Sequence, residues 1–181
     1  MVDSRVMVTS ITLEHILNFL LDAPMFGDLD PSELSQIVSI LQIQHLRDGQ
    51  AVFREGQVGD AWYVIFDGRA EVFKDSDAGP RCIASLGPRA CFGEMAILDH
   101  SPRMASVITV GDCTVLRFPR RDFEGLLAEG NLAAYKLIYQ MAKVLSVRAR
   151  HSAAQLANAL HLPDGLQARA RSLVEGQSVS E

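Results

Sequence analysis

Residues 92–106, FGEMAILDHSPRMAS, place an acidic residue before a short apolar run and a basic residue after it. A glycine at the start of a helix, here Gly93, lets backbone amides approach a ligand closely, and their partial positive charge suits an anion. The guanidinium of Arg103 would add a planar fork of donors that fits a phosphate. A phosphate alone would be repelled by Glu94, whereas a carboxylate is useful if the ligand also carries a hydroxyl near its phosphate, as a ribose does. The combination indicates a nucleotide site.

The residues next to these charges fit the same interpretation. Met95 and Ala96 would supply the next amides, and the small Ala105 and Ser106 leave room beside the guanidinium. The alternative is an exposed Glu94 and an exposed arginine on a loop, with a glycine needed only for its turn. The residues by themselves leave both interpretations open.

Residues 47–118 have the pattern of short strands. Glycines separate the apolar or alternating runs AVFRE, AWYVIF, AEVFK, RCIASL, MASVITV and CTVLRF. Short strands with turn residues about every eight to twelve positions predict an antiparallel sandwich or barrel. The run GEMAILD has helical character and predicts a short helix inserted between two strands. The charged residues considered above therefore lie around this inserted helix.

Helical patterns flank the strands on both sides. Residues 1–46 are expected to form an N-terminal helical segment, because apolar residues recur at helical spacing and Asp30 can act as an N-cap before Pro31. Residues 119–161 predict a short helix and then a long one, which at about 1.5 Å per residue would extend beyond the barrel. The apolar stripe of the long helix predicts a homodimer through residues 131–160, and residues 162–181 are expected to be a tail.

The composition indicates one globular domain with a helical extension. Hydrophobic residues make up 48% and charged residues 22% of 181 residues, and the net charge of −5 provides no general attraction to nucleic acid. Three scattered cysteines are typical of reduced thiols. We find neither the apolar core of a signal peptide nor an apolar run near the roughly 20 residues of a membrane span. These features favour a cytoplasmic location without membrane contact.

The stretch FGEMAILDHSPRMASV resembles the phosphate-binding cassette of the cyclic nucleotide-binding domain family, in which Phe-Gly-Glu precedes a short helix and an arginine precedes small residues. The glycine spacing of GQAVFREGQVGDAWYVIFDGRAEVF and the segments FPRRDFEGLLAE and LAAYKLIYQMAKVLSV are similar to catabolite-activator-like and protein kinase A regulatory-subunit-like members, so the resemblance covers roughly residues 26–147. It implies an α+β fold. An antiparallel β-roll (double-stranded β-helix, or jelly-roll) would carry the inserted phosphate-binding helix, with N-terminal helices and a long C-terminal helix around it.

The resemblance also implies roles for particular residues. Glu94 would hold the ribose 2′-hydroxyl, and Arg103 would hold the equatorial phosphate oxygen. The other residues expected around the phosphate and ribose are Gly93, Met95, Ala96, Met104, Ala105 and Ser106. Members selective for cyclic GMP typically carry threonine directly after the arginine, and the thioether of Met104 cannot donate the same hydrogen bond. Cyclic AMP is therefore the expected ligand, with cyclic GMP as the second possibility.

The base end departs from the catabolite activator pattern. The positions that match its adenine-contacting Thr-Ser pair are Arg148 and Ala149, which cannot make those contacts. Arg148 could instead stack on the purine, or it could lie solvated on an exposed helix face. Val72, Ala84 and Ser85 are expected to line the base pocket.

Three classes of function follow from these features. The first is a non-catalytic sensor that signals through its C-terminal helix to a dimer contact or to an unidentified effector protein. The alternative is the N-terminal effector domain of a catabolite-activator-type transcription regulator; if the chain is complete, direct nucleic-acid binding is not expected, because a helix-turn-helix domain is not evident after residue 161. An enzyme is disfavoured, because the five histidines are dispersed and no triad spacing is present. We therefore expect no catalytic residue, no metal and no cofactor.

Overall fold

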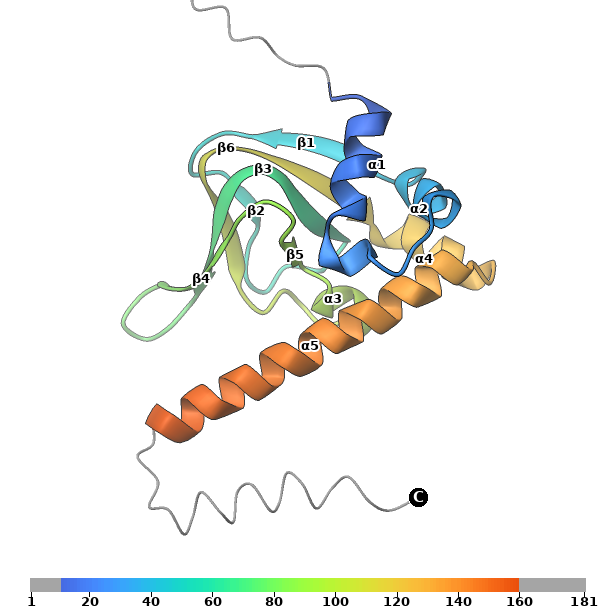
Figure 1. Ribbon diagram of the computed structural model, residues 1–181. Coiled ribbons are helices and arrows are strands. Elements are labelled where there is room, and N and C mark those ends of the chain that lie inside the picture. Colours follow the sequence, from blue (N-terminus) through green and yellow to red (C-terminus); the bar gives the residue numbers. More distant parts are fainter. Residues whose placement is uncertain (1–10, 160–181) are drawn as a thin grey trace, which may run out of the picture. The chain divides into compact units, whose positions relative to one another are not determined.

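Two long antiparallel strands form the centre of the fold in the computed structural model, which describes residues 11–159 (Figure 1). β3 and β6 pair along their length, β1 and β2 pair with β6, and β4 and β5 pair with β3. The six strands are β1 (Gln42–Leu46), β2 (Ala51–Phe53), β3 (Ala61–Lys74), β4 (Arg81–Leu86), β5 (Cys91–Phe92) and β6 (Ser106–Pro119). The sheet curls into a roll, so the predicted α+β fold around an antiparallel β-roll is confirmed.

Each central strand contains two of the runs that the sequence presents as separate strands. AWYVIF and AEVFK are the two halves of β3, and β6 contains CTVLRF and all of MASVITV except its first two residues. Gly68 bends β3 without ending it, at φ 85°, and a Cβ atom there would lie 2.4 Å from the carbonyl oxygen of Asp112. The close approach of the two strands requires a glycine here. Gly68 therefore marks a bend within β3 and not a turn between two strands.

The helices lie where helical patterns predicted them, with one difference. They are α1 (Leu13–Leu21), the 3₁₀ turn η1 (Pro24–Phe26), α2 (Pro31–Val38), α3 (Met95–Leu98), α4 (Arg120–Ala128) and α5 (Leu132–Ala159). The expectation of helix through residue 46 is wrong for Gln42–Leu46, which form β1. These five residues pair in register with Cys113–Arg117 of β6, and such a long-range pairing leaves no mark in the local pattern.

Helix α2 begins at the predicted residue. The Asp30 carboxylate accepts a hydrogen bond from the Glu33 amide at 2.9 Å, and the Glu33 carboxylate accepts one from the Asp30 amide at 2.9 Å. This reciprocal capping box satisfies two amides that the helix itself leaves unpaired. Pro31 follows at the first helical position, where its missing N–H has no cost.

Alternation along β3 separates two apolar clusters. Ala61, Tyr63 and Ile65 point into the roll, where they pack with residues of β5 and β6. Trp62 points to the outer side and stacks on Phe118 with ring centroids 4.0 Å apart. Phe26 and Phe123 complete this outer aromatic cluster, which fixes η1 and α4 against the sheet.

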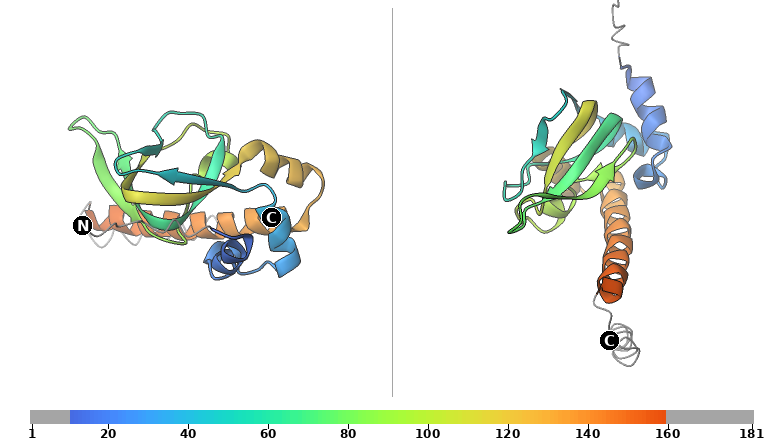
Figure 2. Two further views of the ribbon diagram at one scale, coloured as in Figure 1. Left: turned by 90° about the horizontal axis from the view of Figure 1, so that it is seen from above. Right: turned by 90° about the vertical axis from the view of Figure 1, so that its left-hand side faces the viewer.

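Helices α1, α2 and α4 gather at one end of the roll, and the hairpin that leads into β4 projects from the other end (Figures 1 and 2). The described residues fall into two compact units that divide between residues 140 and 141, and α5 contributes residues to both. The boundaries at residues 46, 118 and 161 stay predictions, and the expected tail, residues 162–181, lies outside the described residues. Within residues 11–159, we find no helix with the length and apolar character needed to cross a membrane.

Candidate functional site

Two glycines allow α3 to lie close against the neighbouring chain. Gly93 connects β5 to the helix with φ 78°, and a Cβ atom there would lie 2.8 Å from Nη1 of Arg103. A Cβ atom at Gly59 would lie 2.3 Å from the Cβ of Ala96, within α3. Both positions therefore exclude a side chain. They bring the first turn of α3 and the guanidinium of Arg103 together. The sequence predicted the place of Gly93 at the start of the helix, and the approach of its amides to a ligand stays a prediction.

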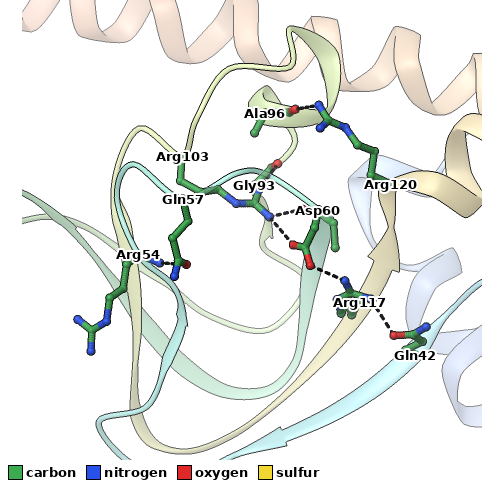
Figure 3. Close-up of polar contacts among 10 residues, drawn as sticks. Gln42, Arg54, Gln57, Asp60, Gly93, Ala96, Arg103, Arg117 and Arg120 are labelled. Atoms are coloured by element: carbon green, nitrogen blue, oxygen red, sulfur yellow. Dashed lines mark hydrogen bonds and ion pairs between the residues drawn. The ribbon is translucent and has the colours of Figure 1, made fainter.

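The Arg103 guanidinium is held inside the protein by main-chain acceptors. Nη1 donates to the carbonyl oxygen of Gly93 at 2.8 Å (Figure 3). Nη2 donates to the carbonyl oxygen of Ala61 at 2.6 Å. The guanidinium carbon lies 4.0 Å from the ring centroid of Phe53 and 5.8 Å from that of Tyr63. The residue is only 3% exposed, and this burial lowers the pKa of the Arg103 guanidinium from its usual value. An arginine keeps its charge even so, which makes this a fixed, buried positive charge.

One carboxylate faces two arginines at this site. Asp60 Oδ1 lies 3.5 Å from Nη2 of Arg103, and Asp60 Oδ2 accepts a hydrogen bond from Nη2 of Arg117 at 2.7 Å (Figure 3). Arg117 also donates to Oε1 of Gln42 at 2.8 Å. Burial, followed by the Asp60 charge, raises the pKa of the Tyr63 hydroxyl, which therefore stays neutral. Asp60 fixes both guanidiniums but neutralises only one of the two charges.

Glu94 is the second buried charge. It stands at the N-cap position of α3 and is 1% exposed. Its carbonyl oxygen accepts hydrogen bonds from the amides of Ile97 and Leu98, at 3.0 and 3.1 Å. The amides of Met95 and Ala96 belong to the first turn, where an α-helix has no acceptors of its own to offer. The structure thus brings Glu94 and the first-turn amides to one end of α3, near Gly93 and Arg103.

The residues that follow Arg103 are tied to the segment between β2 and β3. The Arg103 amide donates to the Gln57 carbonyl at 2.8 Å, and the Gly56 amide donates to the Arg103 carbonyl at 2.9 Å. The Glu55 amide donates to Oγ of Ser106 at 2.9 Å. Met104 is exposed, Ala105 and Ser106 are half-buried, and β6 begins at Ser106. All eight residues predicted around the phosphate and ribose therefore belong to α3 and its flanks or to this anchored segment.

The residues predicted for the base end are only partly brought together. Val72 pairs with Ala84 across β3 and β4, and Val72 packs against the interior of the roll. Ser85 pairs with Glu71, so the alternation of the strands places Ser85 on the opposite face from Val72 and Ala84. The expectation that Ser85 lines the same surface is wrong for this reason. Arg148 belongs to the second of the two compact units, which begins at residue 141, and its role stays a prediction.

Several residues around the arginine were not singled out from the sequence as site residues. The Arg103 guanidinium is surrounded by Asp60, the Ala61 carbonyl, Phe53 and Tyr63. Arg117 contacts the same Asp60 carboxylate. The acidic residue directly after Gly59 was the one available signal. The aromatic and arginine contacts depend on strand register, which the sequence does not reveal.

The described residues do not present an alternative metal centre. Within residues 11–159, no group of three or more His, Cys, Asp or Glu side chains lies where it could hold a metal ion. Cys91 and Cys113 are buried, and burial raises the pKa of the Cys113 thiol above its usual value. The candidate site is therefore the one formed by Glu94, Arg103 and the first turn of α3.

Known proteins that are similar to this chain belong to one family. Residues 43–130 match the family described as "Cyclic nucleotide-binding domain". The cyclic AMP receptor protein of Thermus thermophilus is 33% identical over 124 residues, which cover 68% of this chain and 57% of the receptor. The regulatory subunit of cAMP-dependent protein kinase from Aspergillus fumigatus is 38% identical over 109 residues, 60% of this chain and 26% of that subunit. The chain thus matches less than two thirds of the length of either relative.

A solved structure supports the same assignment. The crystal structure of a cyclic nucleotide-binding domain from Methylobacillus flagellatus KT superposes with a TM-score of 0.71 at 27% identity. The superposition covers 83% of this chain and 85% of that domain. The similarity thus extends over most of both chains and includes the roll.

Proposed function

Because residues 43–130 belong to the cyclic nucleotide-binding domain family, we propose that this chain is a non-catalytic sensor whose cyclic nucleotide binds between α3 and residues 103–106. The observation that carries the proposal is the pair of buried charges, Glu94 and Arg103, beside one four-residue helix. A buried charge is costly unless partners compensate it. A ligand with both a phosphate and a hydroxyl would interact with both of them.

The polar groups at the site match the chemistry of a ribose phosphate. In this proposal Arg103 binds an equatorial phosphate oxygen and Glu94 accepts a hydrogen bond from the ribose 2′-hydroxyl. Amides of Gly93, Ala96 and Ala105 complete the cradle. Two observations support this role of Arg103: its Nε is buried without a hydrogen-bond partner in the described part of the chain, and Asp60 leaves a net positive charge when shared with Arg117.

We propose cyclic AMP as the preferred ligand over cyclic GMP. The residue after Arg103 is Met104, 58% exposed, whose thioether cannot donate a hydrogen bond to a guanine. The names of the two relatives also refer to cyclic AMP. For the base we propose contacts from Val72 and Ala84, which share a face of the roll, and stacking by Arg148.

The output of the sensor is proposed to pass through the C-terminal helix. Exposed apolar residues along α5 support a homodimer through residues 131–160 or a contact with an effector protein, and equilibrium sedimentation tests the dimer. These exposed apolar residues of α5 include Leu132, Tyr135, Tyr139, Val147 and Leu156.

A second candidate is the effector part of a transcription regulator, which is favoured by the 57% coverage of the cyclic AMP receptor protein. A cytoplasmic location fits either candidate.

Isothermal titration with cyclic AMP and cyclic GMP tests the proposal. A ligand of this size is expected to bind at about micromolar strength. Arg103→Ala removes the charged partner of a phosphate, at a cost of about 3–5 kcal/mol, so affinity should fall by at least about a hundredfold. Arg54→Ala is the matched control, because Arg54 is exposed in the neighbouring segment between β2 and β3 and points away from Arg103 (Figure 3).

Two further results make this experiment decisive. Arg103→Lys keeps a charge while losing the fork of donors, so a fold intact by circular dichroism with weakened binding would separate binding from stability. Folded wild-type protein, freed of any carried-over nucleotide, that gives no heat with either ligand would overturn the proposal and the roles of Glu94 and Arg103.

A further inference from the structure

Lys74 and Glu55 form a contact next to the segment that follows Arg103. Lys74 is the last residue of β3, and Glu55 lies shortly after β2. Nζ of Lys74 donates to Oε1 of Glu55 at 2.5 Å and to the carbonyl oxygen of Met104 at 2.8 Å. Oε2 of Glu55 accepts a hydrogen bond from the Asp75 amide at 3.1 Å. We call this arrangement the Lys74–Glu55 clasp, and it joins three separate parts of the chain.

The clasp acts on one particular peptide group. The carbonyl of Met104 faces Nζ of Lys74, and the described chain contains no cis peptide bond. In a trans peptide the C=O and the following N–H point in opposite directions. The amide N–H of Ala105 therefore points away from Lys74. The neighbouring residues are held as well, because the Arg103 main chain pairs with Gly56 and Gln57, and Ser106 Oγ accepts from Glu55.

The charge of Lys74 is already compensated within the clasp. Glu55 lies at salt-bridge distance, and the hydrogen bond from Lys74, followed by the one from the Asp75 amide, lowers the pKa of the Glu55 carboxyl. Glu55 is therefore ionised at neutral pH and neutralises the ammonium. A lysine paired in this way is suited to orienting a carbonyl rather than to binding an anion itself.

We propose that Lys74 and Glu55 are positioning residues, which orient the Met104–Ala105 peptide so that the Ala105 amide donates to an exocyclic oxygen of the ligand phosphate. The inference rests on the proposed function, which already includes the Ala105 amide as a donor, and it adds the two residues that orient this amide. Without the clasp this peptide can rotate, and the amide is no longer pre-oriented when the nucleotide arrives.

Lys74→Met tests the inference, since it keeps the aliphatic stem and removes the donor. Cyclic AMP affinity, measured by titration calorimetry, should fall about tenfold, the value of one hydrogen bond to a charged group. Arg69→Met is the matched control: Arg69 is exposed on the same strand, and the variant removes the same charge, so it should bind like the wild type. Lys74→Arg keeps a donor and should recover most of the affinity.

A spectroscopic measurement separates orientation from general loss of structure. In ¹⁵N–¹H spectra of the wild type, the Ala105 amide proton should shift downfield when cyclic AMP binds, as expected for a hydrogen bond to a phosphate oxygen. In Lys74→Met that shift should be largely lost, while the amides of Gly93 and Ala96 still respond. Glu55→Gln weakens the contact that holds Lys74, so its Ala105 amide shift should lie between that of the wild type and that of Lys74→Met.

The outcomes are distinct for the two proposals. Wild-type binding together with unchanged affinity and an unchanged Ala105 shift in Lys74→Met would overturn the clasp and leave the proposed function standing. Equal losses in Lys74→Met and Arg69→Met would also overturn it, because the effect would then be long-range charge. Failure of the wild type to bind would overturn the proposed function, and the clasp with it.

Discussion

At the scale of single residues, two glycines without side chains allow the close packing of the site. Gly59 allows Ala96 of α3 to approach, and Gly93 allows the Arg103 guanidinium to approach. The charge of Arg103 can be buried because the Gly93 carbonyl accepts its hydrogen bond and the Phe53 ring packs against the guanidinium. Glycines at these positions therefore set how close the helix and the arginine can lie.

Gly59→Ala tests this spatial argument. The new methyl group would lie 2.3 Å from the Cβ of Ala96, so the variant should be destabilised by about 1–3 kcal/mol, as for other overpacked sites. Urea unfolding measures the change. Gly87→Ala is the control, because a Cβ atom there meets nothing within 4 Å. Adding Ala96→Gly to the first variant should recover part of the loss, and no recovery would show that the clash is not the cause.

At the scale of elements, helix α3 depends on its neighbours. With four residues, Met95–Leu98, it is too short to be stable alone. Arg120, the first residue of α4, donates from Nη2 to the Ala96 carbonyl at 2.6 Å and lies beside His100 and Glu124. Its amide also donates to the Asp60 carbonyl at 2.8 Å. One residue thus joins α4 to both sides of the candidate site.

Arg120→Met should loosen α3 because the Ala96 carbonyl loses its donor. We expect the amides of Ile97 and Leu98, which bond to the Glu94 carbonyl, to exchange with solvent about tenfold faster, the value of one hydrogen bond to a charged group. Native-state hydrogen exchange measures this. Arg121→Met, on the exposed neighbouring residue, should leave both rates unchanged. Equal exchange in the two variants would mean that Arg120 does not hold the helix.

The sequence predicted local features better than long-range ones. The capping box at Asp30, the short helix around Met95 and the glycine before Glu94 follow from neighbouring residues, and their positions could be predicted. The merging of runs into β3 and β6, and the strand at Gln42–Leu46, follow from pairing partners far along the chain. The ring contacts of Arg103, the shared Asp60 and the clasp depend on the same register, so sequence patterns could not reveal them.

At the scale of the whole molecule, three carboxylates make the free energy of unfolding depend on pH. The hydrogen bond from Lys136 of α5 lowers the pKa of the Glu33 carboxyl, and the one from Lys74 lowers that of Glu55. The Ser101 amide does the same for Asp99 at the end of α3. Each group has a lower pKa in the folded protein than in the unfolded chain. The stability it contributes is present above the unfolded pKa, about 4, and is lost as pH falls through the folded pKa.

We therefore expect the free energy of unfolding to be nearly constant from about pH 5 to 8 and to fall steeply below about pH 4. Urea unfolding across this range measures it. Glu33→Gln should make the acid decline shallower, because glutamine can still complete the capping box but does not titrate. Glu14→Gln, on an exposed residue of α1, is the control for the same change in charge. If the free energy of unfolding declined equally steeply in both variants, the contact between Glu33 of α2 and Lys136 of α5 would not contribute to the pH dependence of stability.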